Sequence, residues 1–175
     1  APFTGDLCPK DALTARILHA NISHGYVKSI DTAEAEALPG VVKVLTCFDV
    51  PDFPFATDGH PWHVEPPHDN MDRLLLNRHV RYCGDEVAAV IAVDEMSAAR
   101  ALRAIRVEYE ALPFVLDPRE AMAPGAPQLF DSKPRNLCGE THSEDDGYHQ
   151  AAGAPGLLRF DNWYHTPMVQ HCHLE

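Results

Sequence analysis

The hydrophobic and polar positions are patterned most clearly in the middle of the chain. Residues 87–93 form a continuous apolar run, VAAVIAV, which predicts a strand buried on both faces. Asp94 then begins a predicted helix over residues 95–105, whose apolar stripe is Met96, Ala99, Leu102 and Ile105. Residues 106–110 alternate between charged and apolar, which predicts a second strand. Together these elements predict a βαβ-like unit with short connections.

The preceding residues predict further strands and one short helix. Residues 13–22 predict a strand, and the chain continues in extended form from Tyr26 to Ile30. Asp31 and Glu34 form a capping box for a short helix that ends at Pro39-Gly40. The β-branched segment 41–45 predicts a buried strand.

Residues 48–73 predict a long irregular segment that contains five prolines and Trp62. A loop of this length inside a compact domain often carries function. The simpler interpretation, which we favour, is a surface excursion that packs its own aromatic side chains.

The final third of the sequence predicts a change of organisation. Residues 117–127 contain three prolines and predict a linker after a short helical turn. Residues 139–156 are acidic and glycine-rich, so the run Glu144-Asp145-Asp146 predicts a solvated loop. The alternation after Gly156 predicts one or two strands. The sequence thus predicts an α+β fold: a mixed sheet with two main helices in residues 1–122, a linker in 123–156, and the first strands of a second domain in 157–175.

Composition narrows the range of partners. The chain has 175 residues, 45% of them hydrophobic and 23% charged, and its net charge is −12. Such an acidic chain repels phosphate backbones and anionic lipids, which argues against nucleic acid and membrane partners. The five scattered cysteines form no CxxC pair and suit reduced thiols in a cytoplasmic protein.

The tail HCHLE, residues 171–175, is the most chemically suggestive segment. In a strand, His171, His173 and Glu175 share one face, and two imidazoles with a carboxylate can bind zinc. His165 and histidines 60, 63 and 68 are candidate additional ligands. The alternative is a strand whose polar face packs against another domain. The sequence has no glycine-rich phosphate loop, no GxSxG and no HExxH motif.

Three segments carry a resemblance to a known family. ILHANISHG at 17–25, LPGVVKVLTCFDVPD at 38–52 and the run from Leu76 to Pro113 resemble the xanthine dehydrogenase/aldehyde oxidase family. They look like the α/β hammerhead domain at the start of its molybdenum-binding subunit. The tail YHTPMVQHCHLE resembles the segment that enters the molybdopterin-binding domain, and HCHLE looks closest to bacterial xanthine dehydrogenases.

The resemblance implies a parent enzyme that hydroxylates purines, related heterocycles or aldehydes with oxygen from water. It implies molybdopterin with molybdenum in the parent, and [2Fe–2S] centres and FAD on partner domains or subunits. The family's catalytic glutamate and pterin-binding loops match no position in residues 1–175, so no catalytic residue is assigned. Gln170, His171 and His173 are expected near the cofactor region, with no metal held by this segment.

This interpretation predicts that the chain is a piece of a longer protein, inactive alone, that acts as a scaffold for the catalytic domain and its partner subunits. Ala1 in place of a methionine and the strand-like end at Glu175 agree with it. Two other functions stay open: a self-contained zinc protein or hydrolase that uses HCHLE, and a non-catalytic interaction module.

Overall fold

The computed structural model describes residues 7–55, 72–140, 142–144, 146–152, 154–158, 160, 162–167 and 169. The chain divides into two units. One is Cys8–Asn136, and the other combines Ala1–Leu7 with Leu137–Glu175. The first unit contains both sheets of the described chain and most of its buried side chains.

Six strands, four helices and one 3-10 turn succeed one another along the described chain. In order they are β1 (Thr14–His19), β2 (Gly25–Asp31), α1 (Ala33–Glu36), β3 (Val41–Thr46), β4 (His79–Val80), β5 (Glu86–Ala92), α2 (Glu95–Ala104), β6 (Arg106–Ala111), α3 (Pro118–Ala121), the turn η2 (Pro134–Asn136) and α4 (Asp146–Ala152). The predicted α+β class is confirmed.

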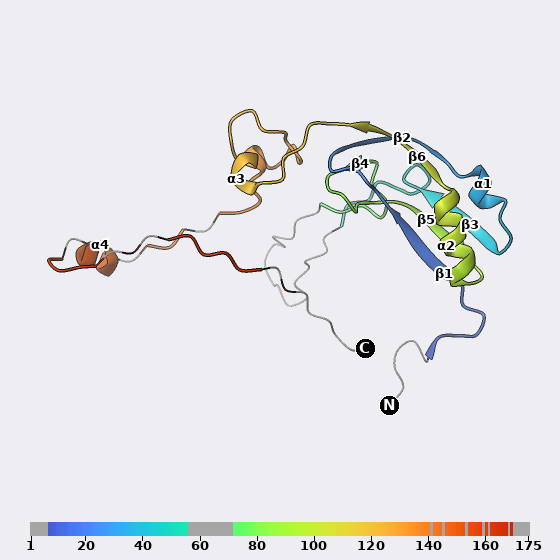
Figure 1. Ribbon diagram of the computed structural model, residues 1–175, viewed down its shortest axis with the longest axis horizontal. Helices are drawn as coiled ribbons and strands as arrows, with labels where there is room; N and C mark the ends of the chain where they lie inside the picture. The colour runs from blue at the N-terminus through green and yellow to red at the C-terminus, as the bar shows by residue number, and fades with distance from the viewer. Residues whose placement is uncertain are drawn as a thin grey trace. The chain divides into compact units, whose positions relative to one another are not determined.

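The first sheet has the order β1-β5-β3, and both pairings are antiparallel. Its central strand β5 comes from the continuous apolar run, because both of its faces are buried, Val90 in one hydrophobic cluster and Val87 in the other. Helices α1 and α2 pack beside this sheet (Figure 1). Val87, Val90 and Ala92 of β5 are fully buried, so this strand is the centre of the unit.

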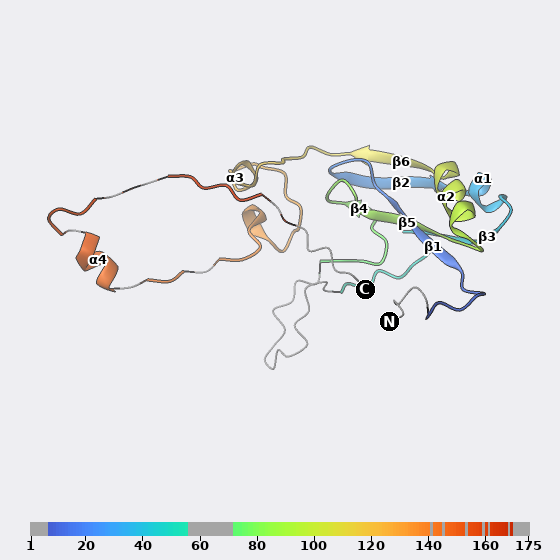
Figure 2. The ribbon, with the colours of Figure 1, turned by 60° about the horizontal axis from the view of Figure 1, so that its bottom comes forward.

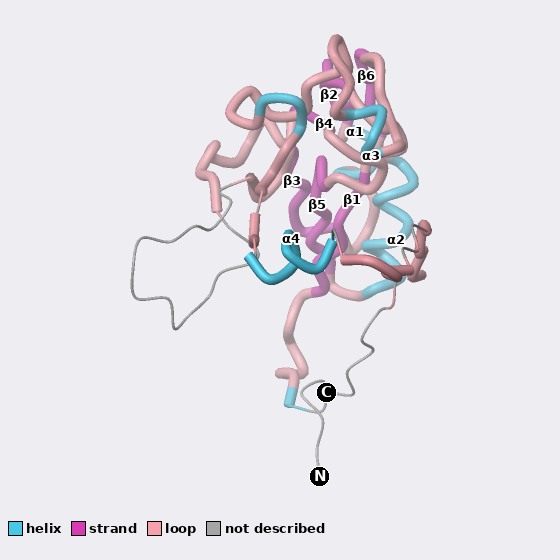
Figure 3. The backbone as a smooth tube through the Cα atoms, turned by 90° about the vertical axis from the view of Figure 1, so that its left-hand side faces the viewer, coloured by secondary structure: helices cyan, strands magenta, loops and turns pink. Residues whose placement is uncertain are grey.

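The second sheet has the order β4-β2-β6 and is also antiparallel. The predicted single mixed sheet is therefore wrong: the described strands form two antiparallel sheets, visible as two groups in Figure 3. Strands β5 and β6 flank α2 in sequence but lie in different sheets, so they are no βαβ unit. β6 lies at the border of the second sheet because its charged residues alternate with apolar ones, a pattern that suits a strand with one solvated face. Figure 2 shows β6 running beside β2.

Two hydrophobic clusters fill the unit. One surrounds Val44 and Val90 under α2, and the other surrounds Val27 and Val87 between the sheets. Three side chains pack against both clusters: Leu18, Ile30 and Val107. The two sheets therefore share one continuous apolar interior.

Helix α2 begins as predicted but faces the sheet differently. The Asp94 carboxylate accepts a hydrogen bond from the Ser97 N–H at 2.7 Å, which confirms the cap. The buried residues of the helix are Ala98 and Ala101, whereas Met96 is 60% exposed. Small side chains let the helix lie close to the strands. The predicted stripe is therefore wrong at Met96, but Leu102 and Ile105 do pack in the core.

The ends of the short helices also differ from the predictions. At α1 the N-cap is Thr32, and Asp31 instead accepts a hydrogen bond from the Ala33 N–H at 3.1 Å. In the second unit, α4 occupies part of the segment predicted as an acidic loop. Propensity explains this helix, since DGYHQAA contains few helix breakers. Among the described residues after Gly156 there is no strand, contrary to the prediction.

Candidate functional site

A buried carboxylate lies at the turn that leads into β5. Asp85 is 3% exposed and its neighbour Asn77 is 2% exposed. The Asn77 side-chain amide donates to one Asp85 oxygen at 2.8 Å, and the Arg81 backbone N–H donates to the other at 2.9 Å. Every oxygen of this buried carboxylate is thus satisfied, as burial demands.

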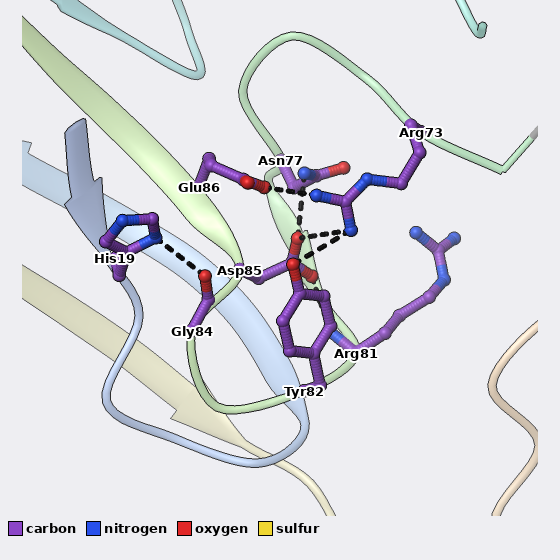
Figure 4. A network of polar contacts seen from close by, with 8 residues as sticks. All are labelled: His19, Arg73, Asn77, Arg81, Tyr82, Gly84, Asp85 and Glu86. Carbon is purple, nitrogen blue, oxygen red and sulfur yellow. Dashed lines mark hydrogen bonds and ion pairs between the residues drawn. The ribbon is translucent and has the colours of Figure 1, made fainter. Parts of the chain in front are cut away.

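Arg73 is the cation of this network (Figure 4). Its guanidinium donates to Glu86 at 2.6 Å and to the Tyr82 hydroxyl at 2.9 Å, and it lies 3.9 Å from Asp85. It also lies over the Tyr82 ring, 5.4 Å from the ring centroid. One arginine therefore connects the segment before β4 to the turn and to the first residue of β5.

Burial raises the pKa of the Asp85 carboxyl, while the Arg81 N–H and the Arg73 charge oppose that rise. The pKa of Arg73 is raised too, chiefly through the Tyr82 hydroxyl. All these groups point toward one another, so the network stabilises the turn and leaves little free capacity for proton transfer to a substrate.

The turn is also connected to β1. His19 donates from Nδ1 to the Gly84 carbonyl at 2.7 Å, as Figure 4 shows. The Ala20 N–H donates to the Asp85 carbonyl at 2.7 Å, and the Gly84 N–H donates to the Ala20 carbonyl at 2.9 Å. The turn and the end of β1 are thus held in one position.

A small pocket of about 250 Å³ adjoins this network. Arg81 lies on its wall, with its guanidinium 4.4 Å from the Phe130 ring centroid and its Nε donating to the Leu129 carbonyl at 2.9 Å. These contacts attach residues 129–130 to the sheets. We assign the pocket no ligand, since its arginines are used in contacts within the chain.

A pair of histidines connects the three strands of the second sheet at one end of that sheet. His24 Nε2 and His79 Nε2 are 3.1 Å apart, and His24 Nδ1 is 2.7 Å from the Pro113 carbonyl. A carbonyl only accepts, so His24 carries its proton on Nδ1 and accepts at Nε2 when neutral. His79 must then donate from Nε2. Between two neutral rings the hydrogen bond therefore has a single direction, from His79 to His24.

The surroundings of His79 favour that neutral form. Its pKa is lowered to about 4, chiefly by burial and also by the nearby Arg81 and His24, whereas Asp131 opposes them. Its ring stacks on Tyr26 with centroids 4.4 Å apart. His79 also lines an open depression of about 710 Å³ with Tyr26 and other residues. The pair is a structural connection between β4, β2 and the end of β6.

The predicted site residues Gln170, His171 and His173 lie outside the described residues, as does Glu175 of the zinc alternative. His165, a candidate zinc ligand, is described and exposed. Within the described part of the chain, no three His, Cys, Asp or Glu side chains gather to hold a metal ion.

Sequence reasoning missed the groups that the structure brings together. Asp85 follows a turn glycine directly before a buried strand, and that position was the available signal for a buried carboxylate. No local pattern indicated the pair of His24 and His79, which are separated by 55 positions. Cys47 is buried and its thiol pKa is raised to about 11 by that burial, so it is a poor nucleophile. None of the described helices is long and apolar enough to cross a bilayer.

The chain is similar to known proteins in sequence and in fold. Residues 1–113 match the family model of the aldehyde oxidase and xanthine dehydrogenase a/b hammerhead domain. The chain is 38% identical over 176 aligned positions to the xanthine dehydrogenase molybdenum-binding subunit of Escherichia coli O157:H7, covering 100% of this chain and 23% of that protein. It is 39% identical over 128 positions to the carbon monoxide dehydrogenase large chain of Afipia carboxidovorans, covering 73% and 15%.

Solved structures agree with the sequence matches. The aldehyde oxidoreductase from Desulfovibrio desulfuricans matches with a TM-score of 0.63 and 34% identity, over 77% of this chain and 15% of that one. The chain therefore spans less than a quarter of the length of these relatives. The expected resemblance is confirmed, and the chain belongs to the a/b hammerhead family of aldehyde oxidases and xanthine dehydrogenases.

Proposed function

We propose that this chain is the hammerhead portion of the large subunit of a molybdenum-dependent hydroxylase similar to xanthine dehydrogenase. The observation that carries the proposal is the 38% identity across the whole chain to a xanthine dehydrogenase molybdenum-binding subunit. The match to that subunit covers both units of this chain, and so it supports a parent of the same kind.

Within such a subunit, we assign the described residues a scaffold role. Their buried polar groups, Asp85, Asn77 and His24, are occupied by contacts within the chain. No metal-binding group is found among the described residues. A part of the protein with these properties contributes shape and interfaces, while the reacting groups come from elsewhere.

The proposed reaction of the whole enzyme is hydroxylation of a purine, a related heterocycle or an aldehyde, with water as the oxygen source. Molybdopterin would supply the redox chemistry, and [2Fe–2S] centres and FAD on partner domains or subunits would carry the electrons away. Cytoplasmic location, the division at residues 1–122, 123–156 and 157–175, and the placement of Gln170, His171 and His173 near the cofactor belong to the same proposal.

The decisive test is the metal content of the product of the whole natural reading frame, measured by mass spectrometry. We expect molybdenum close to one atom per chain, with little zinc. Zinc without molybdenum would overturn the proposal and would favour the HCHLE tail as a zinc site. In that case replacement of His171 and His173 by alanine should remove the zinc, whereas His142→Ala, at an exposed histidine outside the candidate ligands, should leave it and serves as the matched control.

The scaffold role has its own test. The chain of residues 1–175, assayed with xanthine and with an aldehyde, should show no turnover. Turnover by this chain alone would contradict the scaffold role even if the parent contains molybdenum.

A further inference from the structure

We infer that the free edge of β1 receives an extended strand from the polypeptide that the relatives carry beyond the length of this chain. The inference rests on the proposed function, since it names a surface through which the hammerhead portion would join the rest of the subunit. Three observations support it. They are the direction of the backbone groups in β1, the exposed apolar side chains of β1, and the features that protect the other border strands from strand addition.

The direction of the backbone groups in β1 is set by its neighbour β5. The Cys47 N–H donates to the Val87 carbonyl at 3.0 Å, and the Val93 N–H donates to the Gly40 carbonyl at 2.8 Å. Odd-numbered residues of β5 therefore bond toward β3, and even-numbered ones bond toward β1.

The register places Thr14 opposite Ala92 and Arg16 opposite Val90. These β1 residues therefore bond to β5, so the N–H and C=O groups of Ala15 and Ile17 point away from the sheet. No backbone hydrogen bond among the described residues uses these outward groups, and β1 is a border strand. A second strand placed along β1 would find a ready set of donors and acceptors.

The residues whose backbone groups point away from the sheet have apolar side chains, and so does Leu13 before them. Leu13 is 51% exposed, Ile17 is 38% exposed, and Ala15 between them is exposed too. Alternation places all three on one face of the strand. The single formal charge within β1 is Arg16, which belongs to the opposite face and forms an ion pair with Glu95 at 3.5 Å.

The other border strands in the described part of the chain have devices that discourage strand addition. Strand β6 carries three charged side chains in six residues, and β4 is only two residues long. In β3 the Thr46 N–H already donates to the Asp49 carboxylate at 2.8 Å, and Lys43 adds a charge. In β1 the register shift lies at the last position, between Leu18 and His19, and the one charge, Arg16, is paired with Glu95. An unprotected border strand favours a permanent partner over solvent.

Two occupants compete for this edge: a second copy of the chain and the rest of the subunit. Two copies would each bring a net charge of −12, which opposes their association. The chain spans 23% of a relative that matches all of it, so most of such a subunit is polypeptide beyond this chain. We therefore assign the strand to that polypeptide.

The experiment is hydrogen exchange on the product of the whole natural reading frame, with mass detection resolved to individual amides. We expect the Ala15 and Ile17 amides to exchange about 100-fold or more slowly than unprotected amides. Ile17→Lys should remove this protection by placing a charge in the strand pair. Val42→Lys is the matched control, since Val42 is 52% exposed on the opposite border strand, and it should leave the β1 amides protected.

Fast exchange of both amides in the unsubstituted protein would overturn the inference without any variant. Protection that appears only as protein concentration rises, together with a doubled mass, would assign the edge to a second copy and would also overturn it. The exchange readout does not depend on molybdenum, so protected amides in a protein without molybdenum would refute the proposed enzyme and not the added strand.

Discussion

At the scale of single residues, Asp85 shows how a charge is kept inside this fold. Its carboxylate is almost fully buried but has the Asn77 amide, the Arg81 N–H and the Arg73 cation as partners. The pKa of the carboxyl is raised by burial, so the partners offset only part of the cost of removing it from water. Such a group stabilises the fold through its hydrogen bonds. Removing it alone lowers the stability because its partners stay buried.

We predict that Asp85→Ala lowers the free energy of unfolding by roughly 2–4 kcal/mol, because it leaves the Asn77 amide and the Arg81 N–H without their acceptor. Chemical denaturation measures this change. The control is Asp72→Ala at the rim of the same pocket, where the exposed side chain should matter by less than about 0.5 kcal/mol. Equal effects for both variants would contradict the role given to Asp85.

At the scale of elements, the histidine pair connects β4 to the entry of β2 and the exit of β6. The folded state holds His79 with a pKa of about 4, below the ordinary value of 6.5. The unfolded chain therefore binds more protons between these two values, and the free energy of unfolding falls as pH drops from 6.5 toward 4.

We predict a loss on the order of 1–3 kcal/mol from this group across that pH range, allowing for the partial exposure of His79. The measurement is denaturant unfolding at a series of pH values. His79→Gln keeps a donor for His24 but cannot titrate, so its profile should be flatter than that of the unsubstituted chain over the same range. Parallel profiles would show that His79 is not the group responsible.

Helix capping provides a second prediction at this scale. Asp94→Ala should cost about 1 kcal/mol of stability, since it removes the acceptor for the Ser97 N–H. Thr32 occupies the same position in α1 without a side-chain cap bond, so Thr32→Ala should cost only about 0.3 kcal/mol. Chemical denaturation of both variants checks the difference, and a larger loss at Thr32 would contradict the assignment of the caps.

The elements also show what the sequence alone can predict. The buried strand β5 and the cap at Asp94 were predictable because both depend on contiguous residues. Which strands pair was not, because β5 and β6 choose partners far away in sequence according to which faces become buried. The inward face of α2 was predicted at Leu102 and Ile105 but not at Ala98 and Ala101. These two alanines are selected by closeness to the sheet, which hydrophobicity alone does not report.

The candidate site was less predictable than the fold. Its buried polar groups come together from positions as distant as His24, His79 and Pro113. No spacing rule links them, because they meet only after both sheets have formed. The HCHLE tail, which carried the predicted site residues and the zinc alternative, lies outside the described residues, so its role stays a prediction.

At the scale of the whole molecule, the chain consists of a compact unit, Cys8–Asn136, and a second unit that includes Leu137–Glu175. The described residues of the second unit after Asn162 are exposed, and Trp163 is 85% exposed. We expect a glutamate-specific protease to cut first at Glu140 or Glu144. Mass spectrometry of early digests checks this.

Glutamates 34, 36, 95, 108 and 110 are internal controls for the digest, because they lie in helices and strands of the compact unit. They should be cut only later. Early cleavage at Glu108 or Glu110 would show that β6 opens more readily than its pairing with β2 indicates.

The three side chains that contact both hydrophobic clusters, Leu18, Ile30 and Val107, have a consequence for how the compact unit melts. They come from β1, β2 and β6, so both sheets contribute side chains to one shared interior. Loss of the first sheet would remove Leu18 from both clusters, and loss of the second sheet would remove Ile30 and Val107. We therefore expect the two sheets to unfold together, in a single cooperative transition.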